Sequence, residues 1–330
     1  MERTVVKVLV TEPNTWESLP GHPALPDEGI ELTYVDPDDR SALLSAIADV
    51  DVYVGLVFDE EIARVLAPRC RHLLITAAGT DHVATGALPS GVRIANAYGH
   101  EASVAEHVLM VMLAARRGLV WRDAALRRGI WRTRLSDPSA PSFGLLDGRT
   151  VALVGFGHIG QAILGPLAAL GARSVVIRRS PTSSDDPRIA WVGNQGELGR
   201  ACDESDVLVL ACPLNDETRG MIGRDELDRL GPGGCLVNVG RGGLVDEREL
   251  FLALRERRLG SAALDVWGDL PSLEYSRPSP YPFEDLDNVV MTPHYSGTAT
   301  DTYTRRTAGV AENLARIARG EEPANVVTVT

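Results

Sequence analysis

Short apolar runs alternate with helix-compatible segments along most of the chain. Up to Gly79 the helix-compatible segments include DRSALLSAIADV and DEEIARVLAP, and the apolar runs are VVKVLV, ELTYV, VDVYVGLV and HLLITAAG. A short apolar run bounded by polar residues is typical of a buried strand, and strands that alternate with helices form a parallel sheet. The pattern predicts a small parallel α/β unit.

A second alternating series begins at Leu146. Its apolar runs are VALVGFG, SVVIRR, VLVLACPL, GCLVNVG, AALDVW and VVMTP. Two longer segments, 102–119 and 300–320, carry apolar residues at helical spacing. The second of these precedes the terminal run NVVTVT, so we expect the chain to return there to the first unit. The predicted fold class is therefore α/β, with two doubly wound Rossmann-like domains.

The most specific motif follows the first strand of the second series. The stretch from Thr150 to Gly160 reads TVALVGFGHIG and places GxGxxG directly after a strand and before a helix. In that setting Gly155 allows a tight turn, Gly157 lets the backbone approach a pyrophosphate, and Gly160 lets the helix pack on the strand. We expect a dinucleotide site. The predicted domains are a discontinuous substrate domain, 1–100 with 296–330, and an NAD(P)-binding domain, 101–295, that starts with a long helix.

The next strand end indicates which dinucleotide is preferred. NAD-binding chains usually place an acidic residue for the ribose hydroxyls about 20 residues beyond the glycines. Here the strand SVVIRRS ends in Arg178, Arg179 and Ser180. Two guanidinium groups and a hydroxyl suit a 2′-phosphate. The pattern favours NADP(H), with NAD(H) as a possible second cofactor.

Composition excludes several classes of protein. The chain has 330 residues and a formal net charge of −12, which opposes nonspecific binding to nucleic acid or to an anionic membrane. Its four cysteines show no spacing typical of a zinc site, so we expect buried thiols and no metal. No apolar run approaches about 18 residues, and the N-terminus lacks a signal-peptide pattern. We expect a cytoplasmic protein.

Two residues follow strand ends in the second series. Arg241 comes after GCLVNVG, and His294 comes after VVMTP. Because open parallel sheets bind ligands at the carboxyl ends of their strands, we expect both to share one crevice, which we place between the two domains. An arginine can grip a carboxylate and polarise a neighbouring carbonyl, and a histidine can donate a proton near neutral pH. These are the two needs of 2-keto acid reduction.

The chain resembles the D-isomer-specific 2-hydroxyacid dehydrogenase family along nearly its whole length. The matching segments are ITAAGTDHV, SVAEHVL, GRTVALVGFGHIGQAI, CPLNDETRGMI, LVNVGRGGLVDE, ALDVW and DNVVMTPHYSG. The resemblance implies the formate and glycerate dehydrogenase type of fold, a homodimer and a small anionic substrate. It also implies that Arg241 binds substrate and polarises its carbonyl and that His294 does acid/base work.

The resemblance further implies a set of ligand contacts. Backbone amides of Leu56, Val57, Ala78 and Gly79 would meet the substrate carboxylate. The implied cofactor contacts are Val104, Gly155, Gly157, His158, Ile159, Gly160, Arg178, Arg179, Ser180, Cys212, Pro213, Thr218, Val239, Gly240, Arg241, Asp265, His294 and Gly297.

Two further residues bear on substrate choice. His100 falls where formate dehydrogenases place a substrate-contacting asparagine, or it lies at a helix start in solvent. Arg277 lies in SLEYSRPSPYPFEDL, a Pro- and Tyr-rich segment that predicts an ordered lid. Either residue would serve as a second anion hook for a doubly anionic 2-keto acid, for example one that bears a phosphonate; alternatively Arg277 is a solvated loop residue.

The chain departs from the family where DVFxxEP usually supplies a glutamate that partners the catalytic histidine. DVWGDLP puts Leu270 at that position, and Asp269 or the more distant Glu274 would have to take over. Without an anionic partner His294 should titrate lower, so the pH profile of reduction should shift toward acid. Two other functions stay open. One is oxidation of a small oxyanion such as formate or phosphite, and the other is a nucleotide-sensing corepressor without turnover.

Overall fold

The computed structural model describes residues 5–80, 82–140, 142–268 and 277–327. Its backbone forms two compact units, one made of residues 1–100 and 298–330 and the other of residues 101–297. The sequence-based boundary lay two residues earlier, between residues 295 and 296. Each unit holds its own parallel sheet, so the predicted α/β class with two doubly wound Rossmann-like domains is confirmed.

The first unit is a six-stranded sheet in the order β13-β5-β4-β3-β1-β2. Its strands are β1 (Val6–Val10), β2 (Ile30–Tyr34), β3 (Val52–Gly55), β4 (His72–Ile75), β5 (Arg93–Asn96) and β13 (Val326–Val327). Five strands are parallel, and β13 pairs antiparallel with β5, so the chain does return to this unit. The apolar pattern missed β5, because RIAN contains only two apolar residues.

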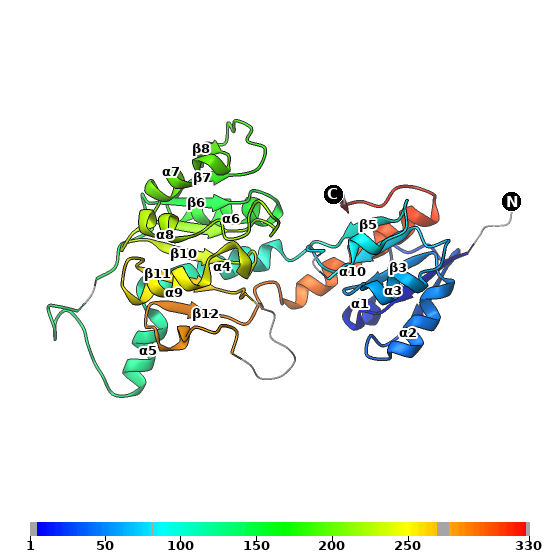
Figure 1. The fold of residues 1–330 in the computed structure, drawn as a ribbon, viewed down its shortest axis with the longest axis horizontal. Helices are drawn as coiled ribbons and strands as arrows, with labels where there is room; N and C mark the ends of the chain where they lie inside the picture. Colours follow the sequence, from blue (N-terminus) through cyan, green and yellow to red (C-terminus); the bar gives the residue numbers. More distant parts are fainter. Residues whose placement is uncertain (1–4, 81, 141, 269–276, 328–330) are drawn as a thin grey trace. The chain divides into compact units, whose positions relative to one another are not determined.

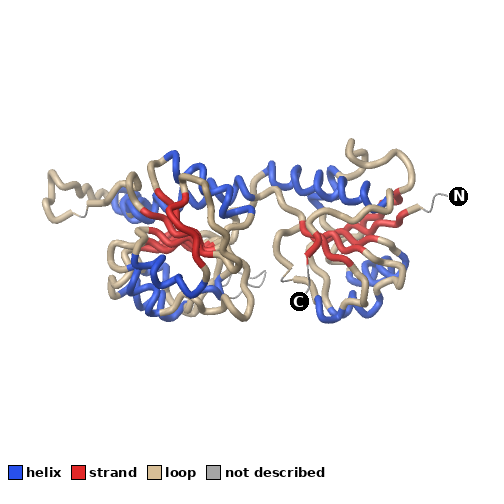
Figure 2. The backbone as a smooth tube through the Cα atoms, turned by 90° about the horizontal axis from the view of Figure 1, so that it is seen from above, coloured by secondary structure: helices blue, strands red, loops and turns tan. Residues whose placement is uncertain are grey.

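Helices cover both faces of this sheet (Figures 1 and 2). They are α1 (Pro13–Ser18), α2 (Arg40–Ala46), α3 (Glu60–Val65) and α10 (Thr300–Ala318), with short 3-10 turns η1 (Ile47–Asp49) and η2 (Thr85–Ala87). Alternate residues of one strand therefore enter different cores. Val8 and Val10 pack with residues of α10, whereas Leu9 packs with residues of α2 and α3. Burial on both faces explains why the strands read as continuous apolar runs.

The second unit is a seven-stranded, fully parallel sheet in the order β12-β11-β10-β9-β6-β7-β8. Its strands are β6 (Thr150–Val154), β7 (Arg173–Ile177), β8 (Ile189–Gly193), β9 (Val207–Leu210), β10 (Cys235–Asn238), β11 (Ser261–Leu264) and β12 (Val289–Met291). The sequence pattern did not identify β8, an edge strand in which two of the five residues are buried.

The described residues of this unit form six α-helices. They are α4 (Glu101–Arg117), α5 (Leu119–Arg127), α6 (His158–Ala169), α7 (Leu198–Asp203), α8 (Arg224–Leu230) and α9 (Glu247–Arg255), with 3-10 turns η3 (Gln195–Glu197), η4 (Gly242–Leu244) and η5 (Phe283–Asp285). The predicted helix 102–119 ends earlier than expected, because Gly118 has φ 61° and breaks it from α5. Among the described helices, none is both long and apolar enough to cross a bilayer.

The strands of the second sheet end together. Val154 of β6 is in register with Ile177 and Leu210, and Leu264 of β11 is in register with Asn238 and Met291. The residues that follow these six strands therefore emerge along one edge. The strand order reverses direction between β6 and β9, which is where open α/β sheets form a ligand-binding crevice.

Candidate active site

The glycine loop after β6 has the geometry that a dinucleotide needs. Gly155 has φ 94°, and a Cβ there would lie 2.6 Å from the carbonyl oxygen of Ala211. A Cβ on Gly160 would lie 2.5 Å from the carbonyl oxygen of Gly155, so the start of α6 can pack on the loop only with glycine. A Cβ on Gly157 would meet no atom within 4 Å. The open side of the loop is therefore at Gly157, where the motif places a pyrophosphate.

A cavity of about 400 Å³ lies beside this loop. Its walls come from three strand ends, those of β6, β7 and β9, and from η3. Eight of the sequence-predicted contacts line it: Gly155, Gly157, Arg178, Arg179, Ser180, Cys212, Pro213 and Thr218. A cavity of this size is within the usual range for small-molecule sites. The described residues therefore fit a bound dinucleotide, with its pyrophosphate at the start of α6.

The cavity wall at β7 is cationic. Arg178 is half-buried, Arg179 and Ser180 are exposed, and neither guanidinium forms an ion pair with a described residue. The lining also includes Glu217, whose backbone carbonyl accepts a hydrogen bond of 2.7 Å from Nε2 of Gln195. The residues that line the cavity thus include two arginines and one glutamate.

The wall that follows β9 is a compact turn. The hydroxyl of Thr218 donates to the carbonyl of Pro213 at 2.8 Å and accepts from the backbone N–H of Asn215 at 2.9 Å. Burial raises the pKa of the Cys212 thiol to about 11, so this side chain is neutral at pH 7 and contributes only packing to the wall. All four cysteines are free, and the described residues contain no group of His, Cys, Asp and Glu that could hold a metal.

Arg241 follows β10 on a loop that its own strand holds in place. The buried side chain of Asn238 donates from Nδ2 to the carbonyl of Arg241 at 2.9 Å and accepts from the N–H of Gly240 at 3.1 Å. The guanidinium of Arg241 donates to the carbonyl of Gly240 at 2.8 Å and is half-buried. This short loop fixes where the guanidinium emerges at the sheet edge.

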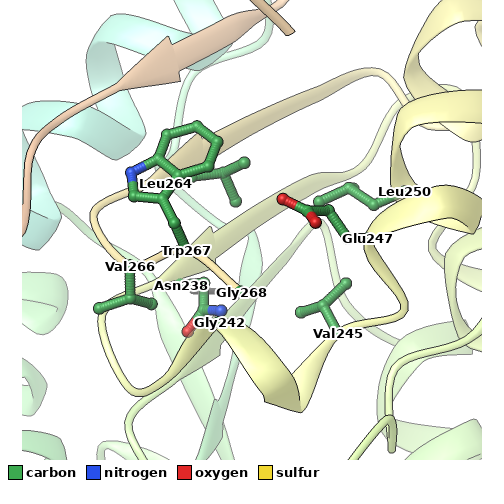
Figure 3. Close-up of a pocket in the computed structure, with 9 residues that line it drawn as sticks. All are labelled: Asn238, Gly242, Val245, Glu247, Leu250, Leu264, Val266, Trp267 and Gly268. Carbon is green, nitrogen blue, oxygen red and sulfur yellow. The ribbon is translucent and has the colours of Figure 1, made fainter. Parts of the chain in front are cut away.

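A small cavity lies next to the Arg241 loop (Figure 3). Its volume is about 20 Å³, room for about one water molecule. Figure 3 shows the carboxylate of Glu247 and the amide of Asn238 among apolar side chains from β11, α9 and the loops next to them. On the same loop, a Cβ on Gly242 would lie 2.0 Å from the carbonyl group of Trp267, so the loop can pack here only with glycine.

His294 follows β12 and lies on a loop bound to its neighbours at several points. It has φ 55°, a conformation that costs a non-glycine residue roughly 1–2 kcal/mol. Asp265, buried at the end of β11, accepts hydrogen bonds from the Thr292 hydroxyl at 2.6 Å and from the N–H groups of Tyr295 and Ser296 at 3.2 and 3.0 Å. The indole N–H of Trp267 donates to the carbonyl of Thr292 at 3.0 Å. These bonds flank His294 on both sides.

The structure places Arg241 and His294 on the same edge. Each lies three residues beyond the last residue of its strand, and those last residues are in register with Leu264 of β11 between them. Two strand spacings amount to about 10 Å. The glycine loop emerges along this edge as well, so cofactor motif, guanidinium and imidazole all belong to one side of the second unit.

The predicted carboxylate-binding residues lie in the first unit. Leu56 and Val57 follow β3, and Ala78 and Gly79 follow the neighbouring strand β4. None of the four backbone N–H groups donates a hydrogen bond to a described residue. The carbonyl of Val57 accepts from the hydroxyl of Tyr53 at 2.6 Å, and burial raises the pKa of Tyr53 to about 12, so the phenol keeps its proton.

Other predicted residues have different surroundings. His100 is buried, 8% exposed, rather than in solvent at a helix start. Arg277 has a side chain that is 76% exposed and pairs with Glu284 at 3.3 Å.

The remaining predicted cofactor contacts lie outside the larger cavity. Val104 is 2% exposed and packs in the core below α4, and Val239 and Gly240 are buried just after β10. His158 and Ile159 begin α6, and Gly297 ends the second unit. Asp269, Leu270 and Glu274 lie outside the described residues.

Several residues that line the larger cavity were not predicted from the sequence as ligand contacts. They are Val154, Phe156, Ile177, Gln195, Ala211, Asn215, Glu217 and Met221. Phe156, Ile177 and Ala211 adjoin residues that the motifs did identify, so their proximity to strand ends was a usable signal. Asn215, Glu217 and Met221 lie in the matching segment CPLNDETRGMI, whereas Gln195 lies in no segment that a motif identified.

Comparison with known proteins gives a consistent picture. Residues 109–296 match the family model described as D-isomer specific 2-hydroxyacid dehydrogenase, NAD binding domain. A glyoxylate reductase of Korarchaeum cryptofilum is 31% identical over 298 residues, covering 88% of this chain and 86% of the relative. A D-3-phosphoglycerate dehydrogenase of Mycobacterium leprae is 33% identical over 312 residues, 93% of this chain, but the match spans only 56% of that longer relative.

Solved structures agree with these relatives. The NADPH-dependent glyoxylate/hydroxypyruvate reductase of Sinorhizobium meliloti, in complex with NADP and malonate, superposes with a TM-score of 0.79 and 25% identity. The match covers 98% of this chain and 97% of that structure. The similarity therefore extends over both units of the fold.

Proposed function

Because the chain belongs to the D-isomer-specific 2-hydroxyacid dehydrogenase family, we propose that it interconverts a small 2-keto acid and the corresponding 2-hydroxy acid. The observation that carries this proposal is the common edge of the second sheet, where the glycine loop, Arg241 and His294 follow strands that end in register. A nicotinamide dinucleotide, when bound, would supply or accept the hydride at substrate C2.

Arg241 is proposed to bind the substrate. Its guanidinium carries a permanent positive charge and can donate two parallel hydrogen bonds to a carboxylate. A remaining N–H can polarise the adjacent carbonyl, which lowers the energy of the negative charge that develops on the carbonyl oxygen. The bonds from Asn238 hold the loop during this step.

His294 is proposed to move the proton. In reduction the imidazolium gives its proton to the developing alkoxide oxygen of the substrate, and in oxidation the neutral imidazole takes it back. The N–H groups of Leu56, Val57, Ala78 and Gly79, which donate to no described residue, are suited to the substrate carboxylate. The substrate class is therefore a small anionic 2-keto acid, in keeping with relatives that are named glyoxylate reductases.

NADP(H) is proposed as the preferred cofactor. Arg178 and Arg179 line the cavity beside the glycine loop, at the strand end where the ribose is expected. Neither guanidinium forms an ion pair with a residue that the structure describes. A 2′-phosphate would pair with them, whereas Glu217 is the single acidic residue among the described residues that line the cavity. The Sinorhizobium reductase that superposes on this chain holds NADP.

A homodimer is proposed from the surface of the second unit. Seven apolar residues of α4, α5 and the following loop are at least half exposed: Met110, Leu119, Val120, Leu126, Ile130, Trp131 and Leu135. The same stretch, 110–135, carries seven arginines and one aspartate in a chain whose net charge is −12. An apolar, basic surface on an acidic protein fits a second copy of this chain.

Two finer points concern the substrate. A doubly anionic 2-keto acid, dicarboxylic or phosphonate-bearing, would need a second cationic contact, for which His100 and Arg277 remain candidates. Oxidation of a small oxyanion such as formate or phosphite is a second candidate function, favoured by Leu270 at the position of the usual glutamate. Oxyanion oxidation needs no partner that tunes a histidine for proton transfer.

A turnover panel tests the proposal. Purified protein is mixed with NADPH or NADH and glyoxylate, hydroxypyruvate, a dicarboxylic or a phosphonate-bearing 2-keto acid, and separately with NADP⁺ or NAD⁺ and formate or phosphite. Steady loss of reduced nicotinamide with a 2-keto acid supports the proposal. Turnover with formate or phosphite alone supports the oxyanion alternative, and tight dinucleotide binding without turnover on any substrate supports a nucleotide-sensing corepressor.

A further inference from the structure

The loop that carries His294 is held from the helix side as well as from the sheet. On the sheet side, Asp265 and Trp267 bind Thr292, Tyr295 and Ser296. On the helix side, the hydroxyl of Ser103 in α4 donates to the carbonyl of Ser296 at 2.7 Å. One turn further along α4, His107 reaches the same loop. Since His294 itself has a left-handed backbone, its position depends on these contacts.

His107 makes three contacts with this network. Its Nε2 lies 3.4 Å from the hydroxyl of Thr292 and 3.7 Å from the carboxylate of Asp265. Its ring packs edge to face on Tyr295, with ring centroids 5.2 Å apart and planes at 88°. The side chain is nearly buried, and burial lowers its pKa despite the opposing effect of Asp265. At neutral pH the imidazole is uncharged.

The hydrogen positions in this network follow from counting protons. The Thr292 hydroxyl has one proton, and its shortest contact, 2.6 Å to Asp265, takes that proton. The same oxygen can then only accept from His107, so the tautomer with the proton on Nε2 is the one that fits. The chain of bonds runs from His107 through Thr292 to Asp265, and the carboxylate in turn accepts from the amides on the far side of His294.

We propose that His107 is a positioning residue for His294, which acts by fixing Thr292, Tyr295 and Asp265 and thereby the loop between them. The proposal rests on the proposed function for the role of His294, but its structural part does not. Packing alone would need only an apolar side chain of similar size at position 107. Positioning needs an N–H donor at the place of Nε2.

The test compares two substitutions of similar volume. His107→Leu fills the space without a donor, and His107→Gln places an amide N–H near the position of Nε2. Val111→Ala is the control, because Val111 is a buried residue of α4 one turn beyond His107 whose apolar side chain cannot form a hydrogen bond with the His294 loop. Amide hydrogen exchange at Tyr295 and Ser296 reports the loop, and exchange in β6 reports global stability.

We expect exchange at Tyr295 and Ser296 to rise at least tenfold in His107→Leu relative to β6, and to stay within threefold of wild type in His107→Gln and Val111→Ala. With a 2-keto acid substrate, kcat of His107→Leu should fall at least tenfold while its KM for the cofactor stays within twofold of wild type. His107→Gln should restore most of the lost kcat.

Unchanged amide exchange of the loop in His107→Leu would overturn the proposal. Faster loop exchange with an unchanged kcat would overturn it as well. If the wild-type protein turns over no substrate, the proposed function is refuted. Amide exchange would then still show whether His107 holds the loop.

Discussion

Arg178 is the residue on which cofactor preference depends. It lies at the carboxyl end of β7, at the place where NAD-binding chains usually carry an acidic residue, and it lines the dinucleotide cavity. Arg178→Asp removes a charge that would pair with a 2′-phosphate and adds one that repels it. We expect the ratio of kcat/KM for NADPH to that for NADH to fall more than about tenfold, equivalent to about 1.4 kcal/mol.

Arg173 provides the control for this substitution. It is an exposed arginine at the opposite end of the same strand and does not line the cavity. Arg173→Asp makes the same charge change and should leave the ratio unchanged. If Arg178→Asp also leaves it unchanged, the cationic wall has no role in the choice of cofactor.

Arg241 is the residue on which substrate binding depends. Arg241→Ala removes the guanidinium but keeps the loop bonds of Asn238, which involve only backbone atoms of residues 240 and 241. We expect kcat/KM for the 2-keto acid to fall about a hundred- to a thousandfold, the usual loss when one donor to a developing oxyanion is removed. Arg248→Ala, at an exposed arginine of α9, is the control in the same kinetic assay. A loss of less than tenfold in Arg241→Ala would place the substrate elsewhere.

At the scale of elements, two glycines of the loop between β6 and α6 should have different effects when they are substituted. A change at Gly160 should affect stability, and a change at Gly157 should affect dinucleotide binding. A Cβ at Gly160 would meet the carbonyl of Gly155, whereas a Cβ at Gly157 would meet nothing within 4 Å. Gly160→Ala should therefore destabilise the protein by about 1–3 kcal/mol through overpacking. Gly157→Ala should leave the melting temperature nearly unchanged but weaken dinucleotide binding by about tenfold or more, equivalent to about 1.4 kcal/mol.

Thermal unfolding and titration of NADPH fluorescence measure these two effects separately. Since Gly157 is extended rather than left-handed, an alanine there introduces no backbone strain, and each variant serves as the other's control. Loss of stability in Gly157→Ala, or normal NADPH binding by that variant, would contradict the placement of the pyrophosphate at this loop.

Elements also show how far local patterns reach. The strand runs and the GxGxxG motif depend on neighbouring residues, so the periodicity identified nearly every strand that is buried on both faces. It missed β5, which has only two apolar residues, and the edge strand β8, and both pair with adjacent parallel strands through their backbones. The break between α4 and α5 was missed because Gly118 was taken as part of one helix.

At the scale of the whole molecule, the exposed apolar residues of α5 predict the assembly. Leu119 and Leu126 are seven residues apart on one face of this helix and are both more than half exposed. If a second copy covers this face, the double substitution Leu119→Asp and Leu126→Asp should convert a dimer into a monomer. Light scattering on a sizing column measures the mass, and Leu170→Asp, at an exposed site after α6, is the control. A wild-type monomer would contradict the proposed homodimer.

Family membership and fold class were both accessible from the sequence, and the comparisons and the structure confirm them. The proposed roles of the site residues remain predictions, although the structure places many of them along one sheet edge. Arg277, one of the two predicted anion hooks, pairs with Glu284 and has a side chain that is 76% exposed, which are the surroundings expected of a solvated loop arginine.

The sequence by itself determined most of the buried strands, the two long helical segments and the dinucleotide loop, because apolar periodicity and glycine spacing act over a few neighbouring residues. The roles of Arg241 and His294 are predictions that the sequence supplied and that kinetics must test. Only the tertiary structure decided that Asn238 holds the Arg241 loop, and that Asp265, Trp267 and His107 together hold the loop of His294. Those contacts join residues up to 185 positions apart. Their formation depends on strand order and register, which arise from the packing of the complete sheet and have no local signature in the chain.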